Sequence, residues 1–280
     1  MRGQFYLDMY ARPEKREGAW MDDYQSRRRL SDGKIQTPIA FLTCNFSPPV
    51  DSSQNALLTH EEVLTLFHEF GHGLQHMLTL VDYEDVSGIN GVAWDAVELP
   101  SQFLEYFAWE KSVLDLISSH YKTDQALPDK IIQQMRAAKN FQASLQLLRQ
   151  LELALFDFRL HAEFDPAKGY AQVQRLLDGI REEIDVLPVV SYNRFQHAFS
   201  HIFAGGYAAG YYSYLWAEVL ACDAFYKFLE DGIFNPETGK AFLETFLEQG
   251  GAIDAMELFE KFRGRPPKIQ PFLENLDIDS

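Results

Sequence analysis

Cysteine is scarce in this sequence: Cys44 and Cys222 are the only two among 280 residues. No CxxC pair is present, so we expect neither a thiolate zinc site nor a disulfide framework. Two unpaired thiols are typical of a reducing compartment. The N-terminal stretch MRGQFYLDMY also lacks the apolar core of a signal peptide. These absences together predict a cytoplasmic protein.

The sequence also lacks long apolar runs and an excess of basic residues. The longest aromatic and apolar stretch, YYSYLWAEVLACDAF, contains Glu218 and Asp223 and is too short to span a bilayer. The chain has 41 acidic residues against 25 lysines and arginines, which gives a formal net charge of −16. Because phosphate groups bind to basic surfaces, this balance disfavours nucleic acid and anionic membranes as partners.

The residues that are present favour a mostly helical protein with a large core, since 46% of them are hydrophobic. Two runs rich in aromatic and β-branched residues, QFYLDMYA and TPIAFLTCNF, predict strands within residues 1–50. From residue 56 to residue 280 the apolar spacing is helical. We therefore predict one domain over residues 1–280, mainly α-helical, with a small antiparallel β-sheet near its N-terminus.

One helix is predicted to be especially long. Residues 130–164 carry apolar side chains at helical spacing, and no Gly or Pro interrupts them before Pro166. Pro128 and Asp129 would open this helix.

The stretch TLFHEFGHGLQHML, residues 65–78, carries the strongest chemical signal. His68 and His72 lie one helical turn apart, so both imidazoles can reach one ion at a Zn–N distance of about 2.0–2.1 Å. His76 lies a further turn away, so we expect it not to bind the ion but either to support a ligand or to be structural. Glu69 flanks the same face and could take a proton from a zinc-activated water, which is the chemistry of an H-E-x-x-H motif. Upstream, Thr59 and Glu62 form a capping box that predicts the start of the helix.

The same residues allow two other interpretations of this helix. A histidine-rich polar face can be ordinary solvated surface, but Gly71 and Gly73 each disfavour a helix interior by about 1 kcal/mol, which indicates that something needs the space. The overlapping Glu69-x-x-His72 is also the unit of di-iron carboxylate bundles. Such sites need a second E-x-x-H, and the sequence contains none.

A zinc hydrolase needs a third protein ligand, and GINGVAWDAVELPSQFLEYF, residues 88–107, offers Glu98. From the pattern alone, Asp95-x-x-Glu98 is more typical of a helix cap. The stretch SHIFAGGYAAGYYSYLWAEV, residues 200–219, also allows two interpretations. Its tyrosines at i, i+4 and i+7 would share one helical stripe and are more often core packing, whereas its glycines favour a loop or hinge.

The longer motifs resemble a known family. FHEFGHGLQHML together with SGINGVAWDAVELPSQFLE is similar to the thimet oligopeptidase family of zinc metallopeptidases. FYLDMYARPEKREGAWM, PIAFLTCNFSPP and FRGRPP resemble further segments of that family, so the similarity extends over essentially the whole chain. The resemblance implies a zincin-like catalytic domain. It also implies that PIAFLTCNFSPP is the strand along which an extended peptide is bound.

The resemblance also implies the site residues. His68, His72 and Glu98 would bind one Zn²⁺ per chain, Glu69 would be the general base, and Glu105 and Asp95 are candidates for hydrogen bonds to the ligands. The tyrosine segment is similar to the family's H-x-x-x-G-G-Y…Y-Y-x-Y loop. There Tyr207 and Tyr214 would donate hydrogen bonds to the oxyanion, with His201 assisting, and Tyr211, Gly205 and Gly206 would line the substrate cleft.

The implied function is that of a zinc-dependent endopeptidase, an oligopeptidase, acting on short unfolded peptides. The alternative is a truncated module that holds zinc and peptides without turnover. Members of the family carry a large N-terminal helical half, so we expect this chain to correspond to the C-terminal catalytic part alone. A surface facing the absent half would be partly apolar and could lead to self-association.

Overall fold

The computed structural model describes residues 1–49 and 56–278. A three-stranded sheet lies near the N-terminus in the order β1 (Gln4–Tyr10), β5 (Ile39–Phe46), β2 (Trp20–Gln25). Both predicted strands are therefore confirmed. Along β5 every second residue is buried, because alternate side chains of a strand point to opposite faces. The boundary that we expected after residue 50 lies outside the described residues.

The expectation of an antiparallel sheet is wrong for one strand. β2 pairs with β5 antiparallel, but β1 pairs with β5 in parallel. Parallel neighbours need a crossover connection, and here the intervening residues supply β2 and a short hairpin, β3 (Arg28–Arg29) with β4 (Ile35–Gln36). The acidic sequence WMDDYQ of β2 does not alternate clearly between apolar and polar, so the sequence did not indicate this strand.

The order of the sheet also corrects the expected peptide-binding strand. β5 has a neighbour on each edge, so its backbone has no free edge to offer a peptide. Within the described part of the chain, β1 and β2 are the edge strands.

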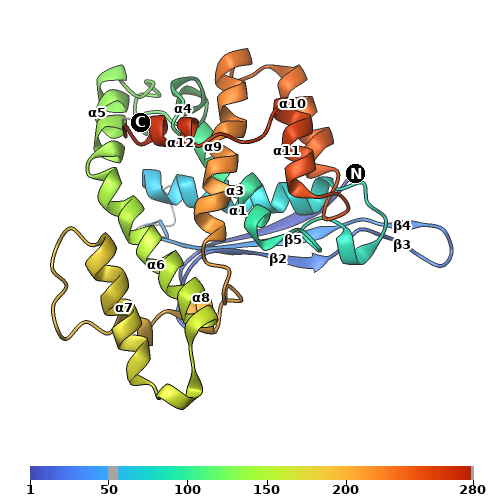
Figure 1. The fold of residues 1–280 in the computed structure, drawn as a ribbon. Coiled ribbons are helices and arrows are strands. Elements are labelled where there is room, and N and C mark those ends of the chain that lie inside the picture. The colour runs from blue at the N-terminus through green and yellow to red at the C-terminus, as the bar shows by residue number, and fades with distance from the viewer. Residues whose placement is uncertain (50–55, 279–280) are drawn as a thin grey trace.

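Helices fill the rest of the described chain, and the prediction of a mainly helical fold is confirmed (Figure 1). Helix α3 packs between α1 and α9. In Figure 1, α9 stands between α5 and α6 on one side and α10 and α11 on the other. The elements are α1 (His60–Leu78), η1 (Glu84–Val86), α2 (Trp94–Val97), α3 (Leu99–Phe107), α4 (Lys111–Ile117), α5 (Asp129–Asn140), α6 (Ala143–Glu163), η2 (Pro166–Lys168), α7 (Ala171–Ile184), η3 (Phe195–His197), α8 (Ser200–Phe203), α9 (Ser213–Asp231), α10 (Pro236–Phe242), a π-helix η4 (Leu243–Leu247), α11 (Ala255–Arg263) and α12 (Gln270–Asn275).

Two apolar clusters support these helices. The larger one joins α3, α9 and the C-terminal helices through aromatic contacts such as Phe103 stacked on Phe242 at 4.0 Å between ring centroids. The smaller one joins α6, α7 and the tyrosine segment, with Phe156, Leu177 and Ile180 fully buried. The metal-binding candidates and the tyrosines are thus supported by different clusters.

The long helix predicted over residues 130–164 is in fact two helices. α5 ends at Asn140 and α6 begins at Ala143, because Gln142 adopts a left-handed backbone conformation with φ of 58°. The end of α5 is tied to the C-terminal segment, where Asn140 Nδ2 donates to Asp277 Oδ2 at 2.6 Å. These distant contacts fix the break, and no Gly or Pro marks it.

The FRGRPP segment is held by one buried carboxylate. Asp223 of α9 is fully buried and pairs with Arg263 Nε at 3.1 Å and with Arg265 Nη2 at 2.6 Å. The end of α11 is therefore anchored to α9, next to the larger cluster.

The cysteines and the surface agree with the sequence in part. Cys44 and Cys222 are buried free thiols, as expected. No helix within residues 1–49 and 56–278 is long and apolar enough to cross a membrane. Large apolar side chains are exposed on β1 and around residues 186–192, including Tyr6 and Tyr192. The expected self-association through such a surface stays a prediction.

Helix α1 starts as predicted, because Thr59 Oγ1 accepts from Glu62 N and the Glu62 side chain accepts from Thr59 N. Its glycines explain how closely α3 can approach. A Cβ on Gly71 would lie 2.4 Å from Pro100 O and 2.6 Å from Ser101 Cα, which are backbone atoms. A Cβ on Gly73 would meet only side-chain atoms, Leu42 Cδ2 of β5 at 3.2 Å and Met77 Cε at 3.7 Å. The need for space at Gly71 is thus confirmed.

We expect Gly71→Ala to lower the free energy of unfolding by about 1–3 kcal/mol, as overpacking does. The steric clash outweighs the better helix propensity of Ala, which is worth about 1 kcal/mol. Gly73→Ala is the matched control in the same helix, and it should be nearly neutral because Leu42 can rotate. Urea unfolding of both variants checks this. Equal stability of the two would show that α1 and α3 can separate without penalty.

Candidate metal centre

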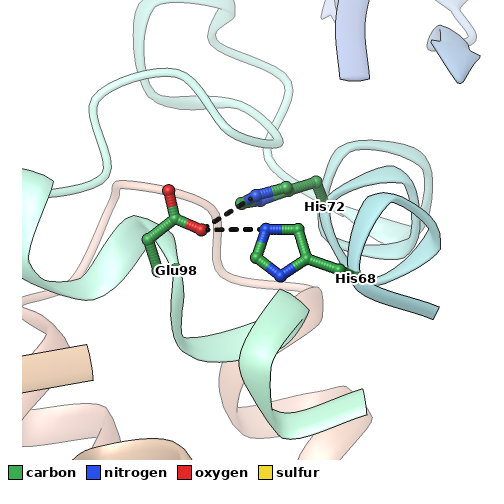
Figure 2. Close-up of side chains that lie close together, drawn as sticks. All are labelled: His68, His72 and Glu98. Carbon is green, nitrogen blue, oxygen red and sulfur yellow. Dashed lines mark ion pairs between the residues drawn. The ribbon is translucent and has the colours of Figure 1, made fainter. Parts of the chain in front are cut away.

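Three side chains converge between α1 and the start of α3. Glu98 Oε2 lies 3.3 Å from His68 Nε2 and 3.1 Å from His72 Nε2, as Figure 2 shows. The three potential ligand atoms all lie within 4.8 Å of one another. His68 and His72 project from successive turns of α1, whereas Glu98 sits at the junction of α2 and α3. The helix contact at Gly71 brings these two elements together.

The donor set fits a metal ion. Two imidazole nitrogens and one carboxylate oxygen are the ligands of the hydrolytic zinc sites that leave a position open for water. Both Nε2 atoms point at the same carboxylate oxygen, and Glu98 is only 3% exposed. The expectation that Glu98 could be merely a helix cap is not supported, because its side chain makes no capping bond to α3 among the described residues.

Neighbouring side chains hold two of these residues in place. The imidazole Nδ1 of His68 is 2.6 Å from Glu105 Oε1, and Ser101 Oγ donates to Glu98 Oε2 at 3.0 Å. Asp95, the other candidate for such a role, instead accepts a hydrogen bond from the Tyr212 hydroxyl at 3.4 Å. Of the two, Glu105 is the one that contacts a candidate ligand.

The carboxylates of this site are perturbed in opposite directions. Burial alone would raise the pKa of Glu98, but its hydrogen bonds with His68 and His72 hold that pKa well below the usual range. Burial raises the pKa of Glu69. The positive charge of the nearby histidines lowers this pKa, but by less than burial raises it. Glu69 makes no side-chain hydrogen bond within the described part of the chain and is 6% exposed.

His68 is perturbed as well. Burial would lower its pKa, but hydrogen bonds with Glu105 and Glu98 outweigh burial and raise it well above the usual value. His76 behaves differently, since burial lowers its pKa and its Nε2 lies 2.9 Å from Gln25 O of β2. Of the two roles expected for His76, the structural one is confirmed.

Two of the predicted tyrosines, Tyr207 and Tyr214, lie next to Glu98. The Tyr207 hydroxyl donates to Glu98 Oε1 at 2.5 Å, and the ring of Tyr214 stacks on that of Tyr207 at 4.8 Å between centroids. Burial, and then the charge of Glu98, raises the pKa of both phenols. Both hydroxyls therefore keep the proton that an oxyanion donor needs.

These tyrosines do not share a helical stripe. Tyr207 and Tyr211 lie in the turns before α9, and Tyr214 lies in its first turn. The turns are fixed by Asp157 of α6, which is fully buried and accepts from Ala209 N and Tyr211 N, both at 2.9 Å. Asp157 was not predicted as a site residue, although a lone acid within the apolar run LALFDFRL is a usable signal.

A cleft of about 730 Å³ surrounds the candidate metal site. Its lining includes the residues predicted from the H-E-x-x-H and tyrosine motifs: His68, Glu69, His72, Glu98, His201, Gly205, Tyr207 and Tyr214. Arg16, Trp20, Met21 and Trp94 also line it and were not indicated by the sequence. Trp20 and Met21 belong to β2, so an edge strand borders the cleft.

Two predicted substrate-binding residues, Tyr211 and Gly206, are not part of this lining. Tyr211 is buried next to Tyr214 and its hydroxyl is 3.1 Å from Gln150 Oε1. Gly206 packs near Trp94, since a Cβ there would lie 3.4 Å from the indole. Tyr211 thus supports a cleft-lining residue, whereas Gly206 is exposed and lies next to Trp94 of the lining.

Comparisons with known proteins agree with this geometry. The family model described as Peptidase family M3 matches residues 1–278. The chain is 58% identical over 278 residues to oligopeptidase A of Salmonella typhimurium and of Escherichia coli, covering 99% of this chain and 41% of each relative. It is 44% identical over 279 residues to a probable cytosolic oligopeptidase A of Arabidopsis thaliana, covering 97% of this chain and 40% of that protein. The chain thus spans about two-fifths of the length of these relatives.

Solved structures show the same fold at low identity. A structure of PZ peptidase A with an inhibitor aligns with a TM-score of 0.65 and 18% identity, over 97% of this chain and 42% of that one. A carboxypeptidase of Pyrococcus furiosus aligns with a TM-score of 0.60 and 17% identity, over 98% of this chain and 53% of that one.

We expect Glu105→Ala to weaken metal binding by about 10–100-fold, as loss of a carboxylate that orients a ligating histidine does. Asp95→Asn is the matched control, because Asp95 contacts Tyr212 and no candidate ligand. Zinc titration against a competing chelator measures both variants. Equal zinc affinity in Glu105→Ala and Asp95→Asn would contradict the role assigned to Glu105.

Proposed function

This chain belongs to peptidase family M3, and we propose that it is the catalytic part of a zinc-dependent endopeptidase that hydrolyses short, unfolded peptides. The match over residues 1–278 confirms the family indicated by the motifs. One observation carries the proposal: the H-E-x-x-H histidines, Glu98 and a buried Glu69 lie together in one open cleft.

In this proposal His68, His72 and Glu98 hold the zinc ion. Zinc supplies Lewis-acid chemistry, polarising the scissile carbonyl and lowering the pKa of a water molecule. The chain's part in binding is to present the three donors already gathered. Glu105 and Ser101 keep His68 and Glu98 in that arrangement.

Glu69 moves the proton. It accepts the proton of the attacking water as the water oxygen bonds to the carbonyl carbon, and it delivers that proton to the amine nitrogen as the C–N bond breaks. Burial suits Glu69 to this task, because a raised pKa makes its carboxylate a better proton acceptor. No covalent intermediate with the enzyme is needed.

Tyr207 and Tyr214 supply hydrogen bonds to the carbonyl oxygen as it becomes negative. The Tyr207 hydroxyl donates to Glu98 Oε1 in the free cleft and can turn to the substrate oxygen instead. His201 faces Tyr214 at 6.3 Å between ring centroids and assists at the same oxygen or at the peptide. Gly205 leaves backbone open on the cleft wall, Tyr211 supports the wall from behind, and Gly206 lies next to Trp94 of the wall.

The peptide itself is proposed to lie along β2. This strand is at the edge of the sheet in the described part of the chain, and its first residues line the cleft. An extended peptide can add to such an edge through backbone hydrogen bonds, which select for unfolded chains and not for particular side chains. This would explain how short peptides are aligned with the zinc site.

We expect Glu69→Gln to bind about one zinc per chain. Its rate of peptide hydrolysis should fall by at least about a hundredfold, because general base catalysis is removed. Glu61→Gln, at an exposed position of the same helix, is the matched control and should keep full activity. Cleavage of a short quenched peptide and metal content are measured on the same samples.

The outcome of that assay also separates the alternative function. Wild-type protein that binds zinc and peptide without cleaving it would be a peptide-binding module without turnover. Wild-type protein without zinc would overturn the proposed site.

We expect Tyr207→Phe and Tyr214→Phe each to lower kcat by about 10²–10³-fold with little change in KM, as removal of an oxyanion donor does. Tyr192→Phe is the control, because Tyr192 is 80% exposed. Zinc content is checked in parallel, since Tyr207 also bonds to Glu98. A change confined to KM would assign these tyrosines to substrate binding instead.

A further inference from the structure

We propose that a second cavity, behind Tyr214 and His201, binds one large apolar side chain of the peptide. This inference rests on the proposed function, because it assumes a peptide in the cleft. The cavity encloses about 460 Å³ and lies between the α5–α6 break, α9 and α12. We call it the α6–α9 pocket; its walls include Gln146, Leu147, Tyr211, Tyr214, Leu215 and Phe272.

The pocket adjoins the cleft directly. His201 and Tyr214 line both cavities. Tyr214 stacks on Tyr207, and the Tyr207 hydroxyl donates to Glu98. The stacked rings of these two tyrosines therefore separate the candidate metal site from the pocket. A peptide whose scissile carbonyl lies at these tyrosines therefore has a neighbouring side chain within reach of the pocket.

The charges in the pocket already have partners within the chain. Glu218 accepts a hydrogen bond from the Tyr106 hydroxyl. Lys139 Nζ donates to Asn275 Oδ1 at 3.0 Å and lies 5.1 Å from the ring centroid of Trp109. Each of these two charged groups already has a hydrogen-bond partner in the chain, so neither needs an oppositely charged ligand.

The apolar wall, in contrast, is incompletely covered. Leu147, Leu215 and Leu276 are each only partly buried and line the cavity together. Phe272 and the rings of Tyr211 and Tyr214 complete this wall. A large aliphatic or aromatic side chain would cover these surfaces, whereas an acidic side chain would meet Glu218. The pocket thus selects by size and apolarity.

The test fills the pocket from an exposed position. Gln146 is exposed, lies on α6 and faces the pocket, so Gln146→Trp blocks the cavity without altering a buried core position. Ser144→Trp is the matched control, because Ser144 is exposed two residues earlier and does not line the pocket. Both variants are assayed on quenched alanine-rich peptides in which a single Phe occupies successive positions, with cleavage sites identified by mass spectrometry.

We expect wild type and Ser144→Trp to prefer Phe over Ala at one position beside the cleaved bond by at least about tenfold in kcat/KM, the lower end of what an apolar pocket provides. In Gln146→Trp this ratio should fall toward one. A ratio that Gln146→Trp leaves unchanged overturns the proposal. So does a stronger preference for Asp or for a free C-terminal carboxylate at that position, which would assign the cavity to carboxylates held by Lys139.

Failure of the proposed function gives a different result. If wild type cleaves none of the peptides, binding of the same fluorescent peptides is measured by anisotropy, and the Phe-to-Ala ratio of dissociation constants is compared between Gln146→Trp and Ser144→Trp. A Phe preference in Ser144→Trp that Gln146→Trp lacks would support the pocket without turnover. Equal ratios in the two variants would overturn it.

Discussion

The close contact between Gly71 and the backbone of Pro100 and Ser101 determines how the two histidines and Glu98 meet, and the rest of the site is built against these three side chains. The histidines and Glu98 come from helices that are separate in sequence, and only a residue without a side chain lets α1 and α3 approach so closely. Ser101, one of the residues against which Gly71 packs, also donates to Glu98 Oε2. The same contact therefore sets the distance between the helices and the position of the third donor.

The tyrosine side of the site is positioned by an independent part of the fold. Asp157 on α6 holds the turns before α9 through two backbone N–H groups, and the smaller apolar cluster supports α6 from behind. The two sides meet at the hydrogen bond between Tyr207 and Glu98. A site assembled in this way can bind a metal through one side and stabilise an oxyanion through the other. This division agrees with the roles proposed for the histidines and for the tyrosines.

Sequence patterns predicted the site better than its setting. The spacing of His68 and His72, the capping box at Thr59 and Gly71 of α1 are local signals, and the structure bears out their geometry. Glu98 is different, because its local pattern favours a helix cap and only the resemblance to a family implies a metal ligand. The parallel pairing of β1 and the break at Gln142 depend on contacts distant in sequence, so no local pattern contains them. Asp157 holds backbone groups more than fifty residues away, and periodicity does not register such contacts.

The assignment of roles to Glu69 and Glu98 follows from how each meets the same two histidines. Both carboxylates are buried, and burial alone would raise the pKa of each. Glu98 Oε2 lies within 3.3 Å of both imidazole Nε2 atoms, and these contacts lower its pKa, which favours its ionised form and suits a metal ligand. The histidines act on Glu69 only through their charge, without a hydrogen bond. The effect of burial on its pKa is larger, so the pKa of Glu69 is raised. Environments that drive two neighbouring acids apart in this way are typical of catalytic sites, and they favour Glu69 as the group that carries the proton.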